Sequence, residues 1–406
     1  MKLFASPKYF SEAMALVTNL SCFLGLRIFE YPRGHPRSIL SLIYFLFMFG
    51  IFYSGLSNME EKYYANIRLM KLEYVLYNIL RYVHVLSKFK ACHKKIFEID
   101  ETLRQLGLSG NYDSIYFMTI GMITVWIIGS FILSIVAFIH LRIRTDICTT
   151  VYIIVCSTYL LTVNSLNIFE FYLFVRCFQI KFKLINRFLC ENLTNLSTNK
   201  IKLGIYELKD YAKIMDPEQQ KHIFFSTIFR RHRQLQFRIN VLEQVHLELC
   251  KVSKIVCTIL GVQVAWEIGA IIMYLSGAFY NLFIRYVMHQ HKVKGVPAQT
   301  ALTLSLSLLC IFKIVFVSRI CKIAANEGNR ATEIIHEINR CNADADMQEE
   351  IQQFGIQILQ SPVKFSVFGL TLDNRILTMV CIKLLYMKHC YCISVYYIIY
   401  KTTQFM

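Results

Sequence analysis

The side chains best placed to take part in chemistry are polar residues inside long apolar segments. Glu267 lies near the middle of an otherwise uncharged stretch, and Gln263, Ala270 and Tyr274 share its helical face, with Trp266 beside them. A charge at the bilayer centre costs about 2.5–3.5 kcal/mol on insertion scales, so such a residue usually faces the interior of a helical bundle. Two interpretations stay open for Glu267: it lines a ligand cavity, or it makes an interhelical hydrogen bond that fixes packing.

Other polar residues of the apolar segments have simpler interpretations. Lys313 and Glu170 lie near segment ends, and Lys313 is expected to extend its ammonium to the membrane boundary. Small hydroxyl residues share one helical face in each of two segments: Thr300, Thr303 and Ser307 in one, and Thr158, Thr162 and Ser165 in the other. Such residues favour close helix packing over ligand contact.

The sequence contains none of the common catalytic motifs. It has no GxSxG, no HExxH, no Walker loop and no GxGxxG after a strand. A membrane-embedded acyltransferase would need a His or Asp constellation near the bilayer surface, but His84 and His140 are isolated. The pair His289 and His291 lies in a short basic loop without a nearby cysteine or carboxylate, and the 14 cysteines form no paired CxxC spacing. We therefore expect neither an enzyme, nor a metal site, nor a cofactor.

The composition indicates a membrane protein. The chain is 55% hydrophobic and only 17% charged, whereas soluble domains carry about 25% charged residues. A helix needs about 20 apolar residues to cross roughly 30 Å of hydrocarbon. Seven segments approach this length: 38–56, 72–87, 114–139, 147–175, 255–284, 295–317 and 376–400. The second and seventh are the weakest because they contain charged residues. The sequence predicts an all-α polytopic membrane protein with seven transmembrane helices.

The net charge of +17 fits loops that face anionic lipid, because the basic residues lie between apolar segments, and no nucleic-acid partner is expected. Their distribution predicts the N-terminus inside and, with seven spans, the C-terminus outside, opposite to a G-protein-coupled receptor. No proline lies in a span interior, and Pro297 and Pro362 are expected at helix starts. Residues 1–21 lack the apolar core of a signal peptide, so the first span is expected to act as the signal.

Long helical extensions are expected between the spans. Phe178, Phe182, Ile185 and Leu189 recur at helical spacing, as do Leu235, Ile239, Leu242, Val245 and Leu249. The predicted organisation is a cytoplasmic N-terminal segment (1–37), transmembrane helices 1–4 (38–175), a cytoplasmic helical loop (176–254), transmembrane helices 5–6 (255–317), a cytoplasmic anchor (318–361) and transmembrane helix 7 (362–406).

Two stretches carry a family resemblance. HLELCKVSKIVCTILGVQVAWEIGAIIMYLSGAFY, from His246 to Tyr280, and EEIQQFGIQILQSPVKFSVFGLTLDNRIL, from Glu349 to Leu377, resemble insect gustatory receptors, which are related to insect odorant receptors. The remainder of the chain is similar to that family in the order and length of its spans.

The resemblance implies a subunit of a ligand-gated, non-selective cation channel in the plasma membrane, assembled as a homo- or hetero-tetramer. A small-molecule tastant would enter the outer half of the bundle. The implied ligand-binding residues are Trp126, Tyr152, Tyr159, Trp266, Glu267, Tyr274 and Thr303. Aromatic rings with a few polar groups suit sugars, alkaloids or other small organic molecules.

The last segment matches the family only in part. Gln404 and Phe405 stand where the family signature ends, and with Tyr400 they are the implied pore and gate residues. Lys383 and Lys388 would oppose cation passage if they faced the pore. An odorant receptor subunit and a non-conducting variant with an altered C-terminus therefore stay open as alternatives. A metabotropic receptor is disfavoured by orientation and proline placement.

Overall fold

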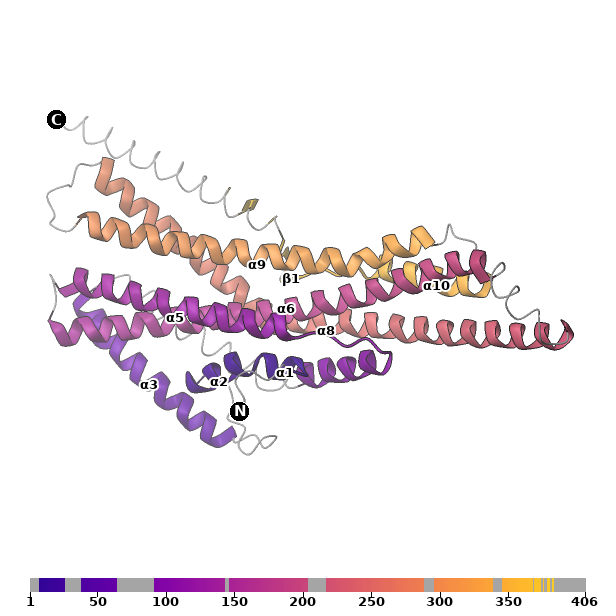
Figure 1. Ribbon diagram of the computed structural model, residues 1–406. Helices are drawn as coiled ribbons and strands as arrows, with labels where there is room; N and C mark the ends of the chain where they lie inside the picture. Colours follow the sequence, from indigo (N-terminus) through magenta and orange to yellow (C-terminus); the bar gives the residue numbers. More distant parts are fainter. Residues whose placement is uncertain are drawn as a thin grey trace.

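The computed structural model describes residues 7–25, 38–63, 91–142, 146–203, 217–287, 296–338 and 345–367, and parts of 369–382. These residues form long helices and one short hairpin (Figure 1). The elements are α1 (Phe10–Ala13), α2 (Ala15–Phe23), α3 (Ser38–Tyr63), α5 (Asp113–Arg142), α6 (Ile147–Leu203), α8 (Pro217–Val287), α9 (Val296–Ile338), α10 (Ala345–Gln360), β1 (Ser366–Val367) and β2 (Leu370–Thr371). A further helix over residues 91–105 precedes α5.

Four of the described helices are long and apolar enough to cross a membrane: α5, α6, α8 and α9. The shorter apolar stretch Ile39–Ser54 lies in α3. Large apolar side chains on α5, such as Val125 and Phe131, are 72% and 67% exposed, as expected of a surface that faces lipid. The prediction of an all-α polytopic membrane protein is confirmed. The predicted span 72–87 lies outside the described residues, and so does 376–400 apart from 378, 379 and 382, so the count of seven stays a prediction.

Three of the spanning helices are much longer than a bilayer is thick. Helices α6, α8 and α9 have 57, 71 and 43 residues, and about 20 residues are enough to span the hydrocarbon. Each therefore extends well beyond the membrane. Figure 1 shows these three helices side by side in this part of the molecule, with α10 packed against α8 and α9. We call this region the helical extension, made of 176–203, 217–254, 318–338 and 345–360.

The helical extension has its own apolar core. Phe178, Phe182, Ile185 and Leu189 of α6 are all buried, as their spacing predicts. The buried residues of α8 in this region include Ile239, Leu242, Val245 and Leu249, and those of α10 include Phe354 and Ile358. Burying faces of this kind is the main source of stability for a helix outside lipid. The side chain of Leu235 is outside the described residues, and the cytoplasmic location of the extension stays a prediction.

The chain that follows α10 is fixed to α9 through its backbone. The Asn329 side-chain amide donates to the Val363 carbonyl at 3.2 Å, and the Asn329 side-chain oxygen accepts from the Val363 N–H at 2.8 Å. The Gly328 carbonyl in turn accepts a hydrogen bond from Nε2 of buried His246 at 3.1 Å. A methyl group at Gly328 would stand 2.7 Å from Cγ2 of Val363. Helices α8 and α9 and the post-α10 segment therefore share one close contact.

The segment from Pro362 onward differs from the sequence prediction. Pro362 was expected at the start of a helix, but it follows the end of α10 and opens an extended segment that leads into the β1–β2 hairpin. The hairpin turns through Gly369, whose φ of 77° suits glycine. Proline lacks an N–H and is common just after a helix end, which accounts for the difference. Asp373 then accepts from the Arg375 N–H at 2.8 Å.

The hairpin packs against the membrane-spanning part of α8. A methyl group at Gly261 would stand only 2.4 Å from Cγ2 of Val367 in β1. The thiol of Cys257, one turn earlier on α8, contacts the backbone of Ser366. Only glycine therefore allows β1 to approach α8 this closely.

This contact predicts an effect of Gly261→Ala. We expect it to destabilise the protein by about 1–3 kcal/mol, because the new methyl group overpacks the contact with Val367. Gly269→Ala on the same helix is the control, since nothing lies within 4 Å of its added methyl group. The melting temperature of the detergent-purified protein should fall for the first variant only. Adding Val367→Ala, which removes the clashing Cγ2, should restore it. If both alanine variants have the same melting temperature, Gly261 does not contact Val367 closely in the folded protein.

Candidate functional site

An ion pair joins two helices inside the bundle. Nζ of Lys313 on α9 donates to Oε1 of Glu267 on α8 at 3.1 Å. The two side chains are only 11% and 6% exposed, so the pair is almost fully removed from solvent. Glu267 lies near the middle of its apolar segment, where an unpaired carboxylate would be unfavourable. The pair therefore neutralises two charges that neither helix could bury alone.

Two more helices reach the same place through Trp126. The Lys313 ammonium lies 5.4 Å from the centroid of the Trp126 ring on α5, within the range of a cation–π interaction. Nε1 of Trp126 donates to Oγ1 of Thr162 on α6 at 3.3 Å. Four spanning helices thus meet at one charged cluster, which we call the membrane cluster (Trp126, Thr162, Glu267, Lys313).

The structure corrects the prediction for Lys313 and supports one of the two interpretations of Glu267. Lys313 was expected to reach the membrane boundary, but it turns to Glu267 because a buried carboxylate lies within its reach. Glu267 was given two open interpretations, and it does make an interhelical hydrogen bond. A direct contact between Glu267 and a ligand stays a prediction.

One turn along α8 from Glu267 lies an amide without a partner. Gln263 is 4% exposed, and neither its Nε2 nor its Oε1 has a hydrogen-bond partner among the described residues. The hydroxyl of Ser318, a residue that is 1% exposed, also has no hydrogen-bond partner among the described residues. Buried polar atoms almost always have partners, so each exception calls for an explanation.

The other predicted ligand-binding residues fall into two groups. Tyr152 and Tyr159 face the N-terminal helices: the Tyr152 hydroxyl donates to the Ile51 carbonyl at 3.2 Å, and the Tyr159 hydroxyl donates to the Leu24 carbonyl at 3.1 Å. The Tyr159 ring also stacks on Phe52 with centroids 3.9 Å apart. These contacts tie α6 to the end of α2 and to α3, and their partners are not residues of the membrane cluster.

The second group lies along α8 and α9. Trp266 and Tyr274 are 40% and 38% exposed. Tyr274 contacts Ser307, whose hydroxyl donates to the Thr303 carbonyl at 2.8 Å. Tyr274 therefore contacts α9 at Ser307, one turn from Thr303. The predicted gate residues Tyr400, Gln404 and Phe405 lie outside the described residues.

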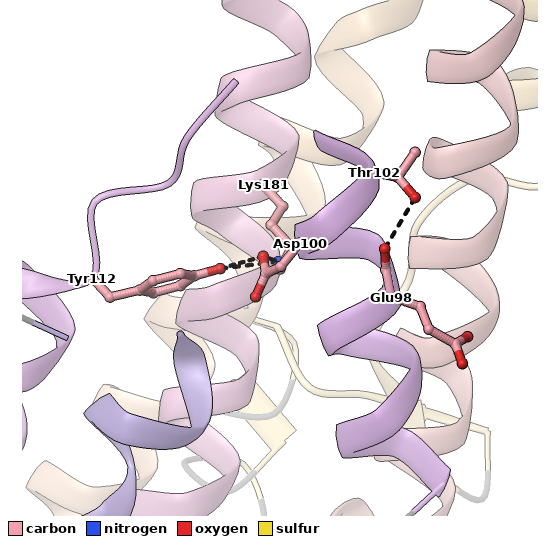
Figure 2. Close-up of polar contacts among 5 residues, drawn as sticks. All are labelled: Glu98, Asp100, Thr102, Tyr112 and Lys181. Carbon is pink, nitrogen blue, oxygen red and sulfur yellow. Dashed lines mark hydrogen bonds and ion pairs between the residues drawn. The ribbon is translucent and has the colours of Figure 1, made fainter. Parts of the chain in front are cut away.

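A second buried charge, in the helical extension, was not predicted. Figure 2 shows Tyr112 and Lys181 directed at Asp100, while Glu98 and Thr102 lie elsewhere on the 91–105 helix. Lys181 is 2% exposed; it pairs with Asp100 and donates to the Tyr112 hydroxyl at 3.0 Å.

This Asp100–Tyr112–Lys181 group, which we call the buried triad, is completed by a hydrogen bond from the Tyr112 hydroxyl to Oδ1 of Asp100 at 2.5 Å. Burial raises the pKa of the Tyr112 phenol, so it stays protonated and can donate. Lys181 stands in the buried face of α6 between Phe178 and Phe182, and a lysine in such a face is the one sequence signal that could have revealed the triad.

The N-terminal helices are fixed to the same region. The Ser21 hydroxyl on α2 donates to Oε1 of buried Glu170 on α6 at 2.6 Å. The Phe10 ring on α1 packs edge-on against Phe174, with centroids 5.2 Å apart. These contacts hold the chain before the first span against α6.

Comparison with known proteins gives a single finding. No curated protein sequence matches the chain significantly. A family model described as "7tm Chemosensory receptor" matches residues 9–386, which includes every helix described above. The long spanning helices and the charged cluster inside the bundle are consistent with that match, and the chain belongs to the 7tm chemosensory receptor family.

Proposed function

We propose that this chemosensory receptor is a gustatory subunit of a ligand-gated, non-selective cation channel in the plasma membrane, opened by a small-molecule tastant. The observation that carries the proposal is the close spacing of three features on α8. Glu267 of the membrane cluster, the unpartnered amide of Gln263 and the Gly261 contact with β1 lie within six residues, or about 9 Å of helix.

This spacing supplies a route from ligand to gate. A ligand opens a channel if it binds the open arrangement better than the closed one. A ligand that shifts α8 at Gln263 or Glu267 also shifts the Gly261 contact, and with it the hairpin. The hairpin leads through Asp373 toward the predicted seventh span, to which we assign the pore and, at Tyr400, Gln404 and Phe405, the gate.

The proposed assembly is a tetramer of identical or mixed subunits, with four predicted seventh helices around the pore. The helical extension presents apolar side chains that the described chain leaves exposed: Ile323 on α9, and Ile356 and Leu359 on α10. Large exposed apolar residues outside lipid favour contact between subunits. The particle mass in mild detergent measures the assembly, and a monomer would contradict it.

A non-conducting variant is the second candidate. It is favoured by Lys383, Lys388 and Lys401 in the predicted seventh span, because positive charges along a pore repel cations. An odorant receptor subunit belongs to the same class of function and differs in ligand.

The test is expression in cells without added G proteins, with calcium imaging and patch recording against a panel of tastants. We expect a ligand-evoked cation current.

We also expect Phe405→Ala to raise the basal leak, because an apolar ring at a constriction blocks ions by excluding water. Replacing 380–403 with a lysine-free apolar helix should increase the current if the lysines impede cations. If every variant reaches the surface and none conducts, the channel assignment is wrong.

A further inference from the structure

The amide of Gln263 is the most unusual polar group inside the membrane-spanning part of the described chain. Its residue is 96% buried (4% exposed), and both amide atoms lack partners among the described residues. Apolar side chains that are themselves buried flank it on α8, among them Ile259, Leu260 and Val264. A buried amide with no hydrogen bond weakens folding, because desolvation of its donor and acceptor is not offset. Burying a methionine at this position would be less unfavourable than burying the unpaired amide.

The charges next to Gln263 are already neutralised. Glu267, one turn away, is paired with Lys313, whose ammonium also lies over the Trp126 ring. An anionic or cationic ligand would enter a low-dielectric site in which the two charges of the neighbouring Glu267–Lys313 pair are already matched to each other. Burying a charge without a partner is far less favourable than burying a neutral hydrogen-bonding group. The site therefore disfavours charged ligands.

We propose that Gln263 is a ligand-specificity residue, and that it selects uncharged small molecules in which one functional group both donates and accepts hydrogen bonds, such as primary amides and hydroxyl-bearing compounds. A primary amide can accept from the Gln263 Nε2–H and donate to its Oε1 in one planar arrangement. This inference rests on the proposed ligand-gated function, and it names the ligand class for a site one turn of α8 from Glu267, on the side nearer the helical extension.

The test uses four aromatic probes of similar size on the full-length protein in detergent. Benzamide is neutral and has both groups, acetophenone has only the acceptor, benzoate is an anion and benzylammonium is a cation. The chain has only two tryptophans, Trp126 and Trp266. One is in the membrane cluster and the other is three residues from Gln263, so tryptophan fluorescence reports binding at this place. On the wild-type protein, benzamide should bind more tightly than acetophenone by about tenfold, one net hydrogen bond.

Gln263→Met is the matching variant, because methionine keeps the length of the side chain and removes the amide. Benzamide affinity should fall about 10–30-fold. The ligand-free protein should melt about 1–3 °C higher, because the unsatisfied amide is gone. Gln352→Met, at an exposed position on α10, is the control and should change neither value.

Three results would overturn the inference: benzamide fails to bind the wild-type protein, benzoate or benzylammonium binds more tightly than benzamide, or Gln263→Met binds benzamide as the wild type does. The wild-type comparison of benzamide with acetophenone needs no variant, so a poorly folding Gln263→Met leaves the test intact. Binding is measured without current. A protein that binds benzamide as expected but never conducts contradicts the channel proposal and leaves the ligand class standing.

Discussion

Lys313→Met should lower the free energy of unfolding by about 3–5 kcal/mol and remove most of the protein from the cell surface. The substitution leaves the Glu267 carboxylate, 6% exposed, without the ammonium that pairs with it. It also removes the cation over the Trp126 ring, so α5, α8 and α9 lose their shared contact. Surface labelling of cells and the melting temperature in detergent measure the two effects.

A double variant distinguishes the effect of the broken ion pair from the effect of losing the lysine side chain. Lys313→Met with Glu267→Met removes both charges and should recover much of the lost stability, because apolar residues often replace a buried pair without loss. Lys322→Met is the control, since Lys322 lies exposed nine residues further along α9. A Lys313→Met protein that melts and traffics like the control would show that the ion pair does not exist in the folded protein.

Asp100→Leu should have an effect of similar size outside the membrane-spanning region. It leaves the Lys181 ammonium, 2% exposed, without its carboxylate, and the expected loss is about 3–5 kcal/mol. The Tyr112 hydroxyl also loses the oxygen to which it donates. Hydrogen exchange should speed up first in the 91–105 helix, which the buried triad holds against α6, and the melting temperature should fall.

The control for Asp100→Leu is Glu98→Gln on the same helix. The Glu98 side chain is 59% exposed and lies 3.9 Å from Lys94, and an exposed pair of this kind contributes little. Because the buried triad is shielded from solvent, its contribution should also change little with added salt. A recovery of stability in Asp100→Leu with Lys181→Met would confirm the pair. An Asp100→Leu protein as stable as Glu98→Gln would exclude it.

Periodicity was sufficient to predict much of this fold. The buried faces of α6 and α8 in the helical extension follow from apolar residues three and four apart, because that spacing places side chains on one side of a helix. The five clearest apolar segments likewise coincide with described helices. Pro362 misled the prediction, because a proline can precede a helix or follow one, and its position depends on the fit of β1 against Gly261.

The partners of buried charges could not be predicted in the same way. Glu267 was recognisable from its place in an apolar segment, but Lys313 is 46 positions away, and nothing local indicates that their helices meet there. Lys181 and Asp100 are 81 positions apart. Which residues pair depends on how the helices are arranged. The sequence therefore shows which charged residue is unfavourable to bury, and only the folded structure shows which residue pairs with it.

Helix α8 is long enough to convert a small rotation into a large displacement at its far end. Its 71 residues cover about 106 Å of helix path at 1.5 Å per residue, and Figure 1 shows that this path bends between the two ends. Proline, a common cause of sharp bends in helices, does not cause this one, because α8 has no proline after its first residue. The part of α8 in the helical extension, 217–254, covers about 57 Å, so a tilt of about two degrees at its membrane end moves its tip by about 2 Å, more than the length of a carbon–carbon bond. Helix α8 is in this sense a lever, and angular changes too small to disturb packing at its pivot become displacements large enough to break contacts at its tip.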